Sequence, residues 1–440
     1  MRTIINLLEN RPMHYFTVNL CFMLLLNNYI VAQSNYGSAY LYSHKYPDDA
    51  TPSWGDDDNG SSNGIAHDNS NWFISQTTVG DHYSRRWIIW RIPVTEPLDQ
   101  DFWNNPSVSI TQMQDVPVLA NNFEDHAGDL VYCNHGNTGY VLVPMTGDLG
   151  ACIVFFTADN LTYVNYELLP NITSVGWCAV NSEGTIVYTS DDNASSIKQY
   201  SINWSIINNT SVHNALSLSD SHPLKDLNGN SLLLHDMQGG EFDDHDEFLY
   251  ISSGLTEFYF WGHCYPEDGL HVFSFINNTW KEVQRSINRD RPPYSPGYFD
   301  YTYDCSDTDE PEGLTYWDLD SGIAPYVSGQ LHVLLMNHAA IFTERVSLLH
   351  YTKEVYVDWL WGHNPSWGFP LPGIWGFTSN SNAFNTLFDA YNWYPIWDGA
   401  EIVFMSYGSP FSNNYPFTGI LNKRIRLVSK GGAITIGKND

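Results

Sequence analysis

The sequence predicts an all-β fold, and three observations lead to that prediction. Stretches with the 3.6-residue period of a helix are nearly absent from its 440 residues. Short apolar or alternating runs recur instead, separated by turns rich in Gly, Asn, Asp and Ser. Aromatic residues make up 15% of the chain, which supplies the apolar surface of a large core and excludes a disordered protein.

The β-like runs form a repeat of three strands. The most regular type of run begins at Trp72, Tyr140, Ile186, Phe248, Leu331 and Ile402. A second type follows each of these after a polar loop and begins at Trp87, Cys152, Ile197, Leu270, Val346 and Arg424. A third type precedes each pair and begins at Ile65, Gly128, Trp177, Gly239, Leu314 and Leu387. Such a repeat predicts a β-propeller, most simply with six blades and within a range of five to seven. The alternative is two successive β-domains, since alternating strands alone do not prove radial repetition.

The repeat divides the chain into four parts. Residues 1–32 have the composition of a signal peptide, and residues 33–64 form a polar N-terminal arm. Within this arm, the run at residues 39–42 is expected to complete the last blade. Residues 65–352 hold the blades. Residues 353–440 form either the last blade or a small C-terminal β region, because the repeat is weakest there.

The N-terminal segment predicts secretion. Arg2 and Arg11 precede an apolar run, and Ala32 fits the small residue required before a cleavage site. Sequons for N-glycosylation agree with an extracellular protein, and they lie at Asn59, Asn160, Asn171, Asn193, Asn203, Asn208, Asn209 and Asn277. No later segment is apolar enough to insert into a membrane once the signal is cleaved.

Cysteines are few. Outside the signal segment there are five, an odd number that cannot pair fully within one chain. We expect disulfides between Cys133 and Cys152 and between Cys264 and Cys305, with Cys178 as a buried thiol. The core, rather than a network of disulfides, must therefore hold the fold together.

The charge excludes whole classes of partner. The chain has 49 Asp and Glu against 19 Lys and Arg, a formal net charge of −30. Nucleic acids and anionic membranes both require clustered cations, so neither is an expected partner. The sequence also lacks the HExxH motif of zinc proteases and the GxGxxG motif of dinucleotide-binding folds.

Several blade motifs carry a family resemblance. These are AHDNSNWF (66–73), HAGDLVY (126–132), GWCAV (176–180), MQGGEF (237–242) and EPEGLTYWDLD (310–320). In this order they resemble a family of secreted, largely uncharacterised β-propeller proteins, over residues 60–350. The resemblance implies a propeller fold and an extracellular location, and it implies no particular reaction.

Polar residues recur at the expected starts of the innermost strands, where the mouth of a propeller channel binds ligands. We expect His67, Asp68 and Gln238 to contact the ligand. The oxygen ligands Asp129, Glu241 and Glu312 suit Ca²⁺ or another divalent metal, with His126 as a general base. The alternative is that these side chains hydrogen-bond to neighbouring backbone and hold the blades together.

The aromatic residues separate into two groups. Trp87, Trp90, Trp177 and Trp317 lie in expected strands and are predicted to pack in the core. Trp361 and Trp375 lie among Gly and Pro, where a tryptophan ring can stack on a sugar. The sequence therefore favours an extracellular protein that binds carbohydrate or another small ligand. The alternatives are a metal-dependent hydrolase or lyase with a site in the central channel, and a structural matrix protein.

Overall fold

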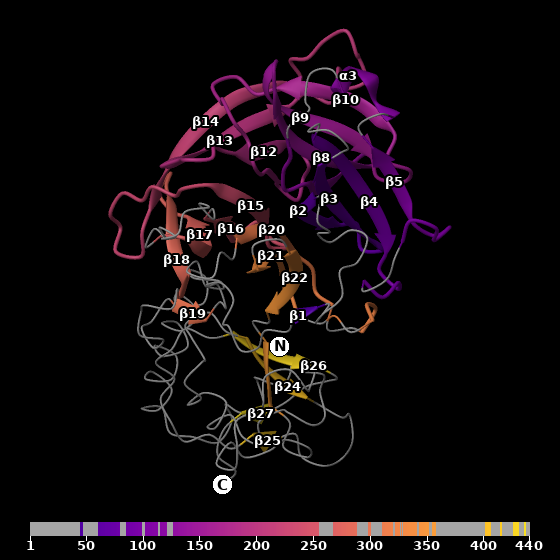
Figure 1. The fold of residues 1–440 in the computed structure, drawn as a ribbon. Coiled ribbons are helices and arrows are strands. Elements are labelled where there is room, and N and C mark those ends of the chain that lie inside the picture. The colour runs from indigo at the N-terminus through magenta and orange to yellow at the C-terminus, as the bar shows by residue number, and fades with distance from the viewer. Residues whose placement is uncertain are drawn as a thin grey trace.

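A computed structural model describes the chain over residues 45–46, 60–79, 85–98, 102–112, 115–120, 126–254, 267–287, 298–300, 310–319, 322–325, 327, 329–340, 343–351 and 354–357, and over short strands between 401 and 436. Antiparallel sheets in this part radiate around one centre (Figure 1). Strands β2, β15 and β20 lie at the centre, and β5, β10, β14 and β18 lie at the periphery. The expected all-β propeller is confirmed.

The first two blades come from residues 60–168. Blade 1 contains β2 (Gly60–His67), β3 (Asn71–Val79), β4 (Arg85–Pro93) and β5 (Ser109–Gln112). A short helix, α3 (Pro117–Ala120), leads to the next sheet. Blade 2 contains β6 (His126–Ala127), β7 (Val131–His135), β8 (Thr138–Gly147), β9 (Gly150–Thr157) and β10 (Tyr163–Leu168). Both β6 and β7 pair with β8, so they are two halves of one interrupted innermost strand.

The next two blades share an edge. Blade 3 contains β11 (Ala179–Val180), β12 (Ile186–Thr189), β13 (Ser196–Ile202) and β14 (Leu216–Lys225). Blade 4 contains β15 (Met237–Phe242), β16 (Leu249–Ser253), β17 (Gly269–Phe275) and β18 (Trp280–Ile287). The outer strands β14 and β18 pair in parallel at Leu224↔Trp280 and Lys225↔Lys281, and β19 (Tyr298–Asp300) pairs with β18. Blades 3 and 4 therefore form one continuous sheet.

The fifth blade closes the ring with the N-terminal arm. It contains β20 (Glu310–Tyr316), β21 (Leu331–Ala340), β22 (Thr343–Tyr351) and β1 (Lys45–Tyr46). The antiparallel pair β1–β22 supplies the outermost strand from the other end of the chain. The closing strand was expected at residues 39–42, which lie outside the described residues, and it is found three residues further on. Such closure joins the first and last blades without a covalent bond.

Five interblade cores show that the ring is complete. Each core is shared by two neighbouring blades, and the core between blades 5 and 1 closes the circle with Trp72 and Trp90 against Trp317 and Leu334. The first-choice number of six blades is therefore corrected to five in the described part of the chain, at the lower limit of the expected range. The four strand tryptophans predicted to be in the core are all buried.

Alternation along each strand serves two cores at once. In β4, Ile88, Trp90 and Ile92 face blade 5, whereas Trp87 and Ile89 face blade 2. Successive side chains of a strand point to opposite faces, so a blade enclosed on both sides needs apolar residues at both parities. This requirement explains why the strand runs look continuous rather than cleanly alternating.

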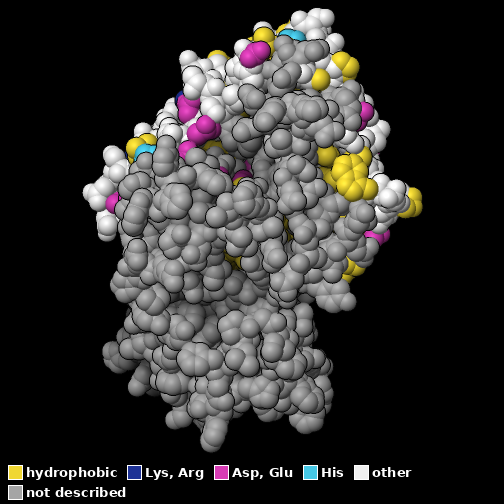
Figure 2. All heavy atoms as spheres, viewed as in Figure 1, with side chains coloured by type: hydrophobic (Ala, Val, Ile, Leu, Met, Phe, Trp, Pro, Cys, Tyr) yellow, Lys and Arg dark blue, Asp and Glu magenta, His cyan; other side chains and the backbone are white. Residues whose placement is uncertain are grey.

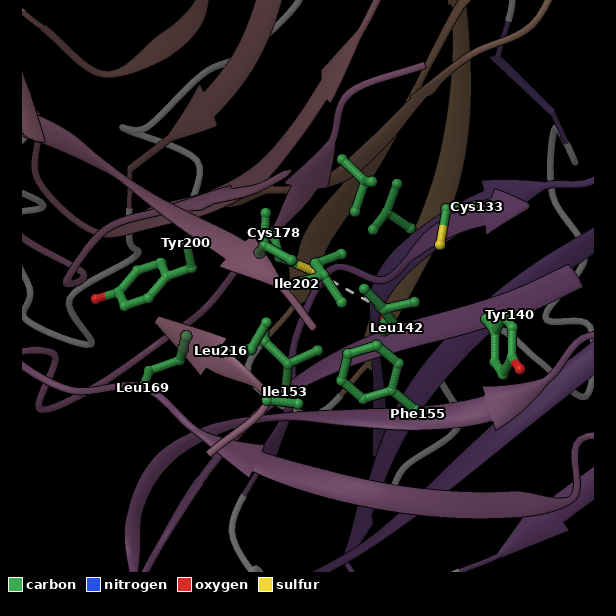
Figure 3. Packing of buried hydrophobic residues seen from close by; sticks show 14 of the residues in the cluster. Cys133, Tyr140, Leu142, Ile153, Phe155, Leu169, Cys178, Tyr200, Ile202 and Leu216 are labelled. Atoms are coloured by element: carbon green, nitrogen blue, oxygen red, sulfur yellow. Dashed lines mark hydrogen bonds between the residues drawn. The ribbon is translucent and has the colours of Figure 1, made fainter. Parts of the chain in front are cut away.

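The three cysteines of the described residues are free and buried, so the expected Cys133–Cys152 disulfide is wrong. Cys152 contacts the core between blades 1 and 2, whereas Cys133 belongs to the core between blades 2 and 3. Cys178 is the buried thiol that was expected, and its Sγ lies 3.8 Å from the Leu142 carbonyl oxygen (Figure 3). Cys264 and Cys305 lie outside the described residues.

The C-terminal region contains parallel strands. Strands β23 (Glu354–Val357), β24 (Glu401–Met405) and β26 (Arg426–Lys430) form one small parallel sheet, and β25 (Asn414–Tyr415) pairs with β27 (Thr435–Ile436). An antiparallel sixth blade was expected to contain the run at Ile402, and the parallel pairing contradicts that. Residues 60–64 were assigned to the loop-like arm, and they instead begin β2. Among the described residues, no helix has the length and apolarity needed to cross a membrane.

Candidate functional site

The axis of the ring is closed by glycine. Each blade places one glycine of its innermost segment at the centre, namely Gly64, Gly128, Gly176, Gly239 and Gly313. A Cβ built on Gly313 would lie 2.5 Å from Gly64 Cα, and one built on Gly128 would lie 2.0 Å from the Gly176 carbonyl oxygen. The backbones of the five blades thus touch one another around the axis, where no side chain larger than hydrogen fits.

Asp129 occupies the remaining space at the centre, and it has no exposed surface. Its Oδ1 accepts the Ile65 N–H at 2.9 Å, and its Oδ2 accepts the N–H groups of Gly240 at 3.0 Å and Leu314 at 3.2 Å. Each donor is the residue that follows an axial glycine. One carboxyl group therefore links blade 2 to blades 1, 4 and 5. Burial raises the pKa of Asp129 well above its usual range, and these three N–H donors act in the opposite direction.

A local irregularity aims these N–H groups inward. The pairing register of the innermost strands shifts between Ser62 and Gly64 in β2, between Met237 and Gly239 in β15, and between Pro311 and Leu314 in β20. A bulge turns one backbone amide out of the ladder. We call the five glycines and Asp129 the axial plug. It separates the face on which the innermost strands begin, the starting face, from the face on which they end, the ending face.

The starting face carries an amide and carboxylates from neighbouring blades. Gln238 Nε2 of blade 4 donates to Glu310 Oε1 of blade 5 at 2.9 Å. Glu310 and Glu312 both begin β20 and are buried, whereas Gln238 is partly exposed. The backbone below them is held in place because Ser252 Oγ donates to the Glu312 carbonyl oxygen at 2.6 Å. A planar amide and a planar carboxylate are therefore fixed beside the axis.

Blade 3 adds a carboxyl group on the same face. A Cβ built on Gly176 would lie 3.7 Å from Gln238 Oε1 and 3.8 Å from Asp192 Oδ1, so both side chains lie close to this axial glycine. Burial raises the pKa of Asp192, although a hydrogen bond from Ser174 opposes the shift. Its backbone carbonyl accepts the Met237 N–H at 2.9 Å, which fixes the position of the residue.

The ending face carries His67. Its ring stacks on Trp317 with centroids 4.3 Å apart, and its Nε2–H donates to the Tyr316 carbonyl oxygen at 2.9 Å. Its Nδ1 accepts the Asn69 N–H at 3.3 Å. Both contacts suit a neutral imidazole. Burial lowers the pKa of His67 to about 4, and the bond to Tyr316 only partly offsets this.

Glu241 and Asp68 also serve backbone groups on the ending face. Glu241 Oε2 accepts the Tyr316 N–H at 3.2 Å, and burial raises the pKa of Glu241 to about 8. Asp68 Oδ1 accepts the N–H groups of Ser70 and Asn71 and so forms the turn between β2 and β3. Through Tyr316, His67 and Glu241 hold blades 1 and 4 to blade 5, whereas Asp68 acts within blade 1.

The residues expected at one site are thus divided among three places. Gln238 and Glu312 lie on the starting face, Asp129 lies in the axial plug, and His67 and Glu241 lie on the ending face. The expected set of Asp129, Glu241 and Glu312 does not fit a metal ion, because the oxygens of Asp129 accept three backbone N–H groups and Glu241 bonds to another. Within the described ranges, no three His, Cys, Asp or Glu side chains are grouped to hold a metal.

The remaining residues that were expected at functional sites lie away from the axial contacts or outside the described residues. His126 pairs with Thr146 at the start of blade 2, and the structure describes its backbone alone. Trp361, Trp375 and Asn59 lie outside the described residues. The other sequon asparagines are exposed, namely Asn160, Asn171, Asn193, Asn203, Asn208, Asn209 and Asn277.

One buried network was missed by sequence reasoning. Ser253 Oγ lies 3.2 Å from His271 Nε2, and His271 Nδ1 lies 2.7 Å from Glu282 Oε1. Arg285 donates to both oxygens of Glu282, from Nε at 2.7 Å and from Nη2 at 2.8 Å. These residues lie on three adjacent strands of blade 4, and no local sequence motif predicts that they meet.

Ser253, His271 and Glu282 follow one another in the order of the nucleophile, the general base and the carboxylate of a catalytic triad. Burial lowers the pKa of His271, so its neutral ring donates from Nδ1 to Glu282. Burial alone would raise the pKa of Glu282, but its bonds to His271 and Arg285 outweigh burial and hold it below the usual range. Ser253 and His271 have no exposed surface, so no substrate reaches either side chain, and Ser253 is the last residue of β16, paired with Gly269. We therefore assign the network to structure: it satisfies buried polar groups between blades 3 and 4.

The axial glycines recur at one position of the sequence repeat. Each of them is the middle residue of a triplet at the start of the innermost strand of its blade. The triplets are NGI (63–65), AGD (127–129), VGW (175–177), QGG (238–240) and EGL (312–314). Aligning the repeats on this glycine, rather than on the polar residues beside it, would have located the centre of the ring.

No family model matches the sequence, and no curated protein matches it either. Among solved structures, the GH43_1 enzyme from Xanthomonas citri complexed with xylotriose has a TM-score of 0.40 at 10% identity, covering 67% of this chain and 88% of that chain. The luciferin-regenerating enzyme has a TM-score of 0.33 at 10% identity, covering 73% and 81%. The β-propeller domain of Cps50 (Swd1) from Myceliophteria thermophila has a TM-score of 0.29 at 10% identity, covering 66% and 83%.

Proposed function

We propose that this protein is a secreted, acidic glycoprotein that binds neutral carbohydrate on the starting face of its propeller. The observation that carries the proposal is the pair of Gln238 and Glu310, joined at 2.9 Å directly beside the axial plug. Neighbouring hydroxyl groups of a sugar both donate and accept hydrogen bonds, and an amide beside a carboxylate offers both functions. Because the backbones of the five blades meet at the axial plug beside the pair, the proposed site does not continue into a channel.

The charge of the chain selects the kind of ligand. Asp and Glu side chains lie over the part of the ring that carries β13 and β14, whereas Lys and Arg are scarce in this view (Figure 2). With a net charge of −30, the protein repels polyanions at long range. A neutral, hydroxyl-rich ligand is therefore favoured over a sulfated or uronic polysaccharide.

A glycan array followed by calorimetry on the full chain tests the binding proposal. We expect Gln238→Ala to weaken binding of the selected sugar at least tenfold. Glu241→Gln is the matched control, because it changes another polar residue of the same innermost strand on the ending face. The absence of binding to any sugar would contradict the proposal, as would equal weakening by both variants. Alanine at Trp361 and Trp375 tests whether these rings extend the site.

Hydrolysis is the second candidate, and a specific observation favours it. Asp192 has a raised pKa on the starting face, as the proton donor of a glycosidase requires, and Glu310 offers a second carboxyl group there. Release of reducing sugar from the bound oligosaccharide would identify the protein as an enzyme. Asp192→Asn would then abolish release while the sugar still binds. No release over days would leave binding as the function.

Secretion and glycosylation can be checked directly. The exposed asparagines of the sequons are compatible with modification. Expression in a eukaryotic host should give protein in the medium whose mass falls after treatment with an N-glycosidase. Retention inside the cell, or an unchanged mass, would contradict this part of the proposal.

A further inference from the structure

A concave feature lies outward from the axis, between blades 3 and 4. It is a cavity of about 430 Å³, within the size range of small-molecule sites. Its walls come from the connection between β14 and β15 and from β18. The polar side chains that face it include Asn228, Ser231, His235, Glu267, Glu282 and Arg285.

The base of the cavity is a buried, hydrogen-bonded ion pair. Glu282 and Arg285 are 1% and 6% exposed, and they form the two-point pair described above. Glu282 Oε2 also accepts the Leu227 N–H at 3.2 Å. This bond fixes the β14–β15 connection, which contains Leu227, to β18. A polar site whose base is already ordered needs little reorganisation when a ligand enters. The rim is open, because Asn228 and Ser231 are exposed.

The residues that line the cavity favour a ligand with many hydrogen-bond donors. Carboxylates outnumber the single guanidinium group, and Asn228, Ser231 and His235 add both donors and acceptors. An anionic ligand is disfavoured by Glu267 and Glu282, whereas hydroxyl groups donate to carboxylates without a charge of their own. Like the Gln238–Glu310 pair, the cavity offers both an amide and carboxylates to the hydroxyl groups of a sugar.

His235, Asn193 and Asp192 lead from the cavity to the axis. His235 Nδ1 lies 3.1 Å from Asn193 Oδ1, and Asn193 Oδ1 also accepts the Asp236 N–H at 3.2 Å. Asp192 precedes Asn193 in the chain and lies beside Gly176 and Gln238 at the axis. The strands next to the cavity, β14 and β16, end on the side of the ring on which β15 begins. Glu267, which also lines the cavity, lies two residues before β17, and β17 begins on the starting face beside the end of β16.

We infer that the cavity is a second subsite for an elongated neutral oligosaccharide whose first sugar binds at the Gln238–Glu310 pair. This inference rests on the proposed function and goes further, because it assigns a chain-length preference and a direction. The sugar chain runs outward from the axis along Asp192 and Asn193 toward His235.

Calorimetry with ladders of xylose and glucose oligosaccharides, from one to four units, tests the inference on the full chain. We expect affinity to rise at least tenfold from one unit to three. Ser231→Trp places a large ring at the rim of the cavity, and it should remove this gain while leaving the affinity for one unit unchanged. Ser217→Trp is the matched control, since Ser217 is exposed on β14 outside the cavity, and it should keep the full gain.

The outcomes are distinguishable. If sugars bind with affinity independent of length, or if Ser231→Trp keeps the gain, the second subsite is wrong and the axial site stands. If no member of the ladder binds, both proposals fail. Spermidine is tested as an organic cation, and spermidine binding that Ser231→Trp abolishes, without any gain from sugar length, would also overturn the assignment.

Discussion

The two faces of the ring use similar residues in different ways. On the ending face, His67 and Glu241 bond to the backbone of Tyr316, and the imidazole of His67 stacks on Trp317. On the starting face, Gln238 bonds to the carboxylate of Glu310, side chain to side chain across two blades. A side chain that serves backbone stabilises the fold, whereas a side-chain pair can exchange its partner for a ligand. The comparison explains why we place function on the starting face and stability on the ending face.

The axial plug keeps the two faces apart, and the largest expected effect comes from disturbing it. In Gly313→Ala, the new Cβ would lie 2.3 Å from Asp129 Oδ1 and 2.5 Å from Gly64 Cα. Backbone cannot move aside as a flexible side chain can, so we expect a loss of about 3 kcal/mol or more in the free energy of unfolding. Urea denaturation measures this loss.

Gly136→Ala is the control for that substitution. Gly136 has a φ of 63° and open space around it, so its replacement costs only backbone strain, about 1 kcal/mol. Equal losses for the two variants would show that the blades do not meet tightly at the axis.

A smaller effect is expected from changing one atom of the plug. Asp129→Asn keeps the shape of the side chain but turns one acceptor oxygen into an NH₂ group, which then faces a backbone N–H. We expect a loss of about 2 kcal/mol, because at least one buried N–H group is left without its acceptor. Hydrogen exchange should show which of Ile65, Gly240 and Leu314 loses protection. Unchanged stability and exchange would mean that Asp129 does not hold the blades together.

The smallest effect concerns the ending face and depends on pH. His67 has a pKa of about 4 in the folded chain and about 6.5 when unfolded, so the unfolded chain binds more protons between these values. Stability from this group is therefore lost as pH falls, by about 1.5 kcal/mol between pH 6.5 and pH 5. Urea midpoints measured across this interval should fall less steeply in His67→Gln than in the natural chain.

Glu241 provides a check on the sign of the pH effect. Its pKa is raised to about 8, so its contribution to stability is lost as pH rises from about 4.5 toward 8. The two intervals overlap between about pH 4.5 and 6.5, where His67 and Glu241 act in opposite directions. Glu241→Gln should therefore flatten the loss of stability between pH 6.5 and 8 and steepen the loss on acidification below pH 6.5. Parallel pH profiles for both variants and the natural chain would contradict the structural role of the ending face.

Much of the architecture was readable from residue order. The three strand types predicted at the runs beginning with Ile65, Trp72 and Trp87 are β2, β3 and β4, and the same holds in blades 3, 4 and 5. In blade 2 the run expected to begin at Gly128 falls instead on the interruption between β6 and β7. A short hairpin loop joins β15 to β16 between Phe242 and Phe248, where Asp243 Oδ1 accepts the N–H groups of Glu247 and Phe248. Such features depend on neighbouring residues and on local turn chemistry.

The placement of the site was not readable in the same way. Polar residues three to five positions apart on one strand, such as Gln238 and Glu241, look like one group in the sequence. A strand rises about 3.3 Å per residue, so they fall on opposite faces of the plug. The network of Ser253, His271 and Glu282 is likewise made by three strands brought side by side.

The acidic charge, the all-β repeat and the buried aromatic residues were determined by the sequence itself, because composition and period act locally. The number of blades was decided by the tertiary structure, since closure depends on whether the first and last blades meet around the axis. Five glycines and one carboxyl group let them meet. The same close approach closes the centre of the ring, which is why the proposed ligand site lies on the starting face rather than in a channel.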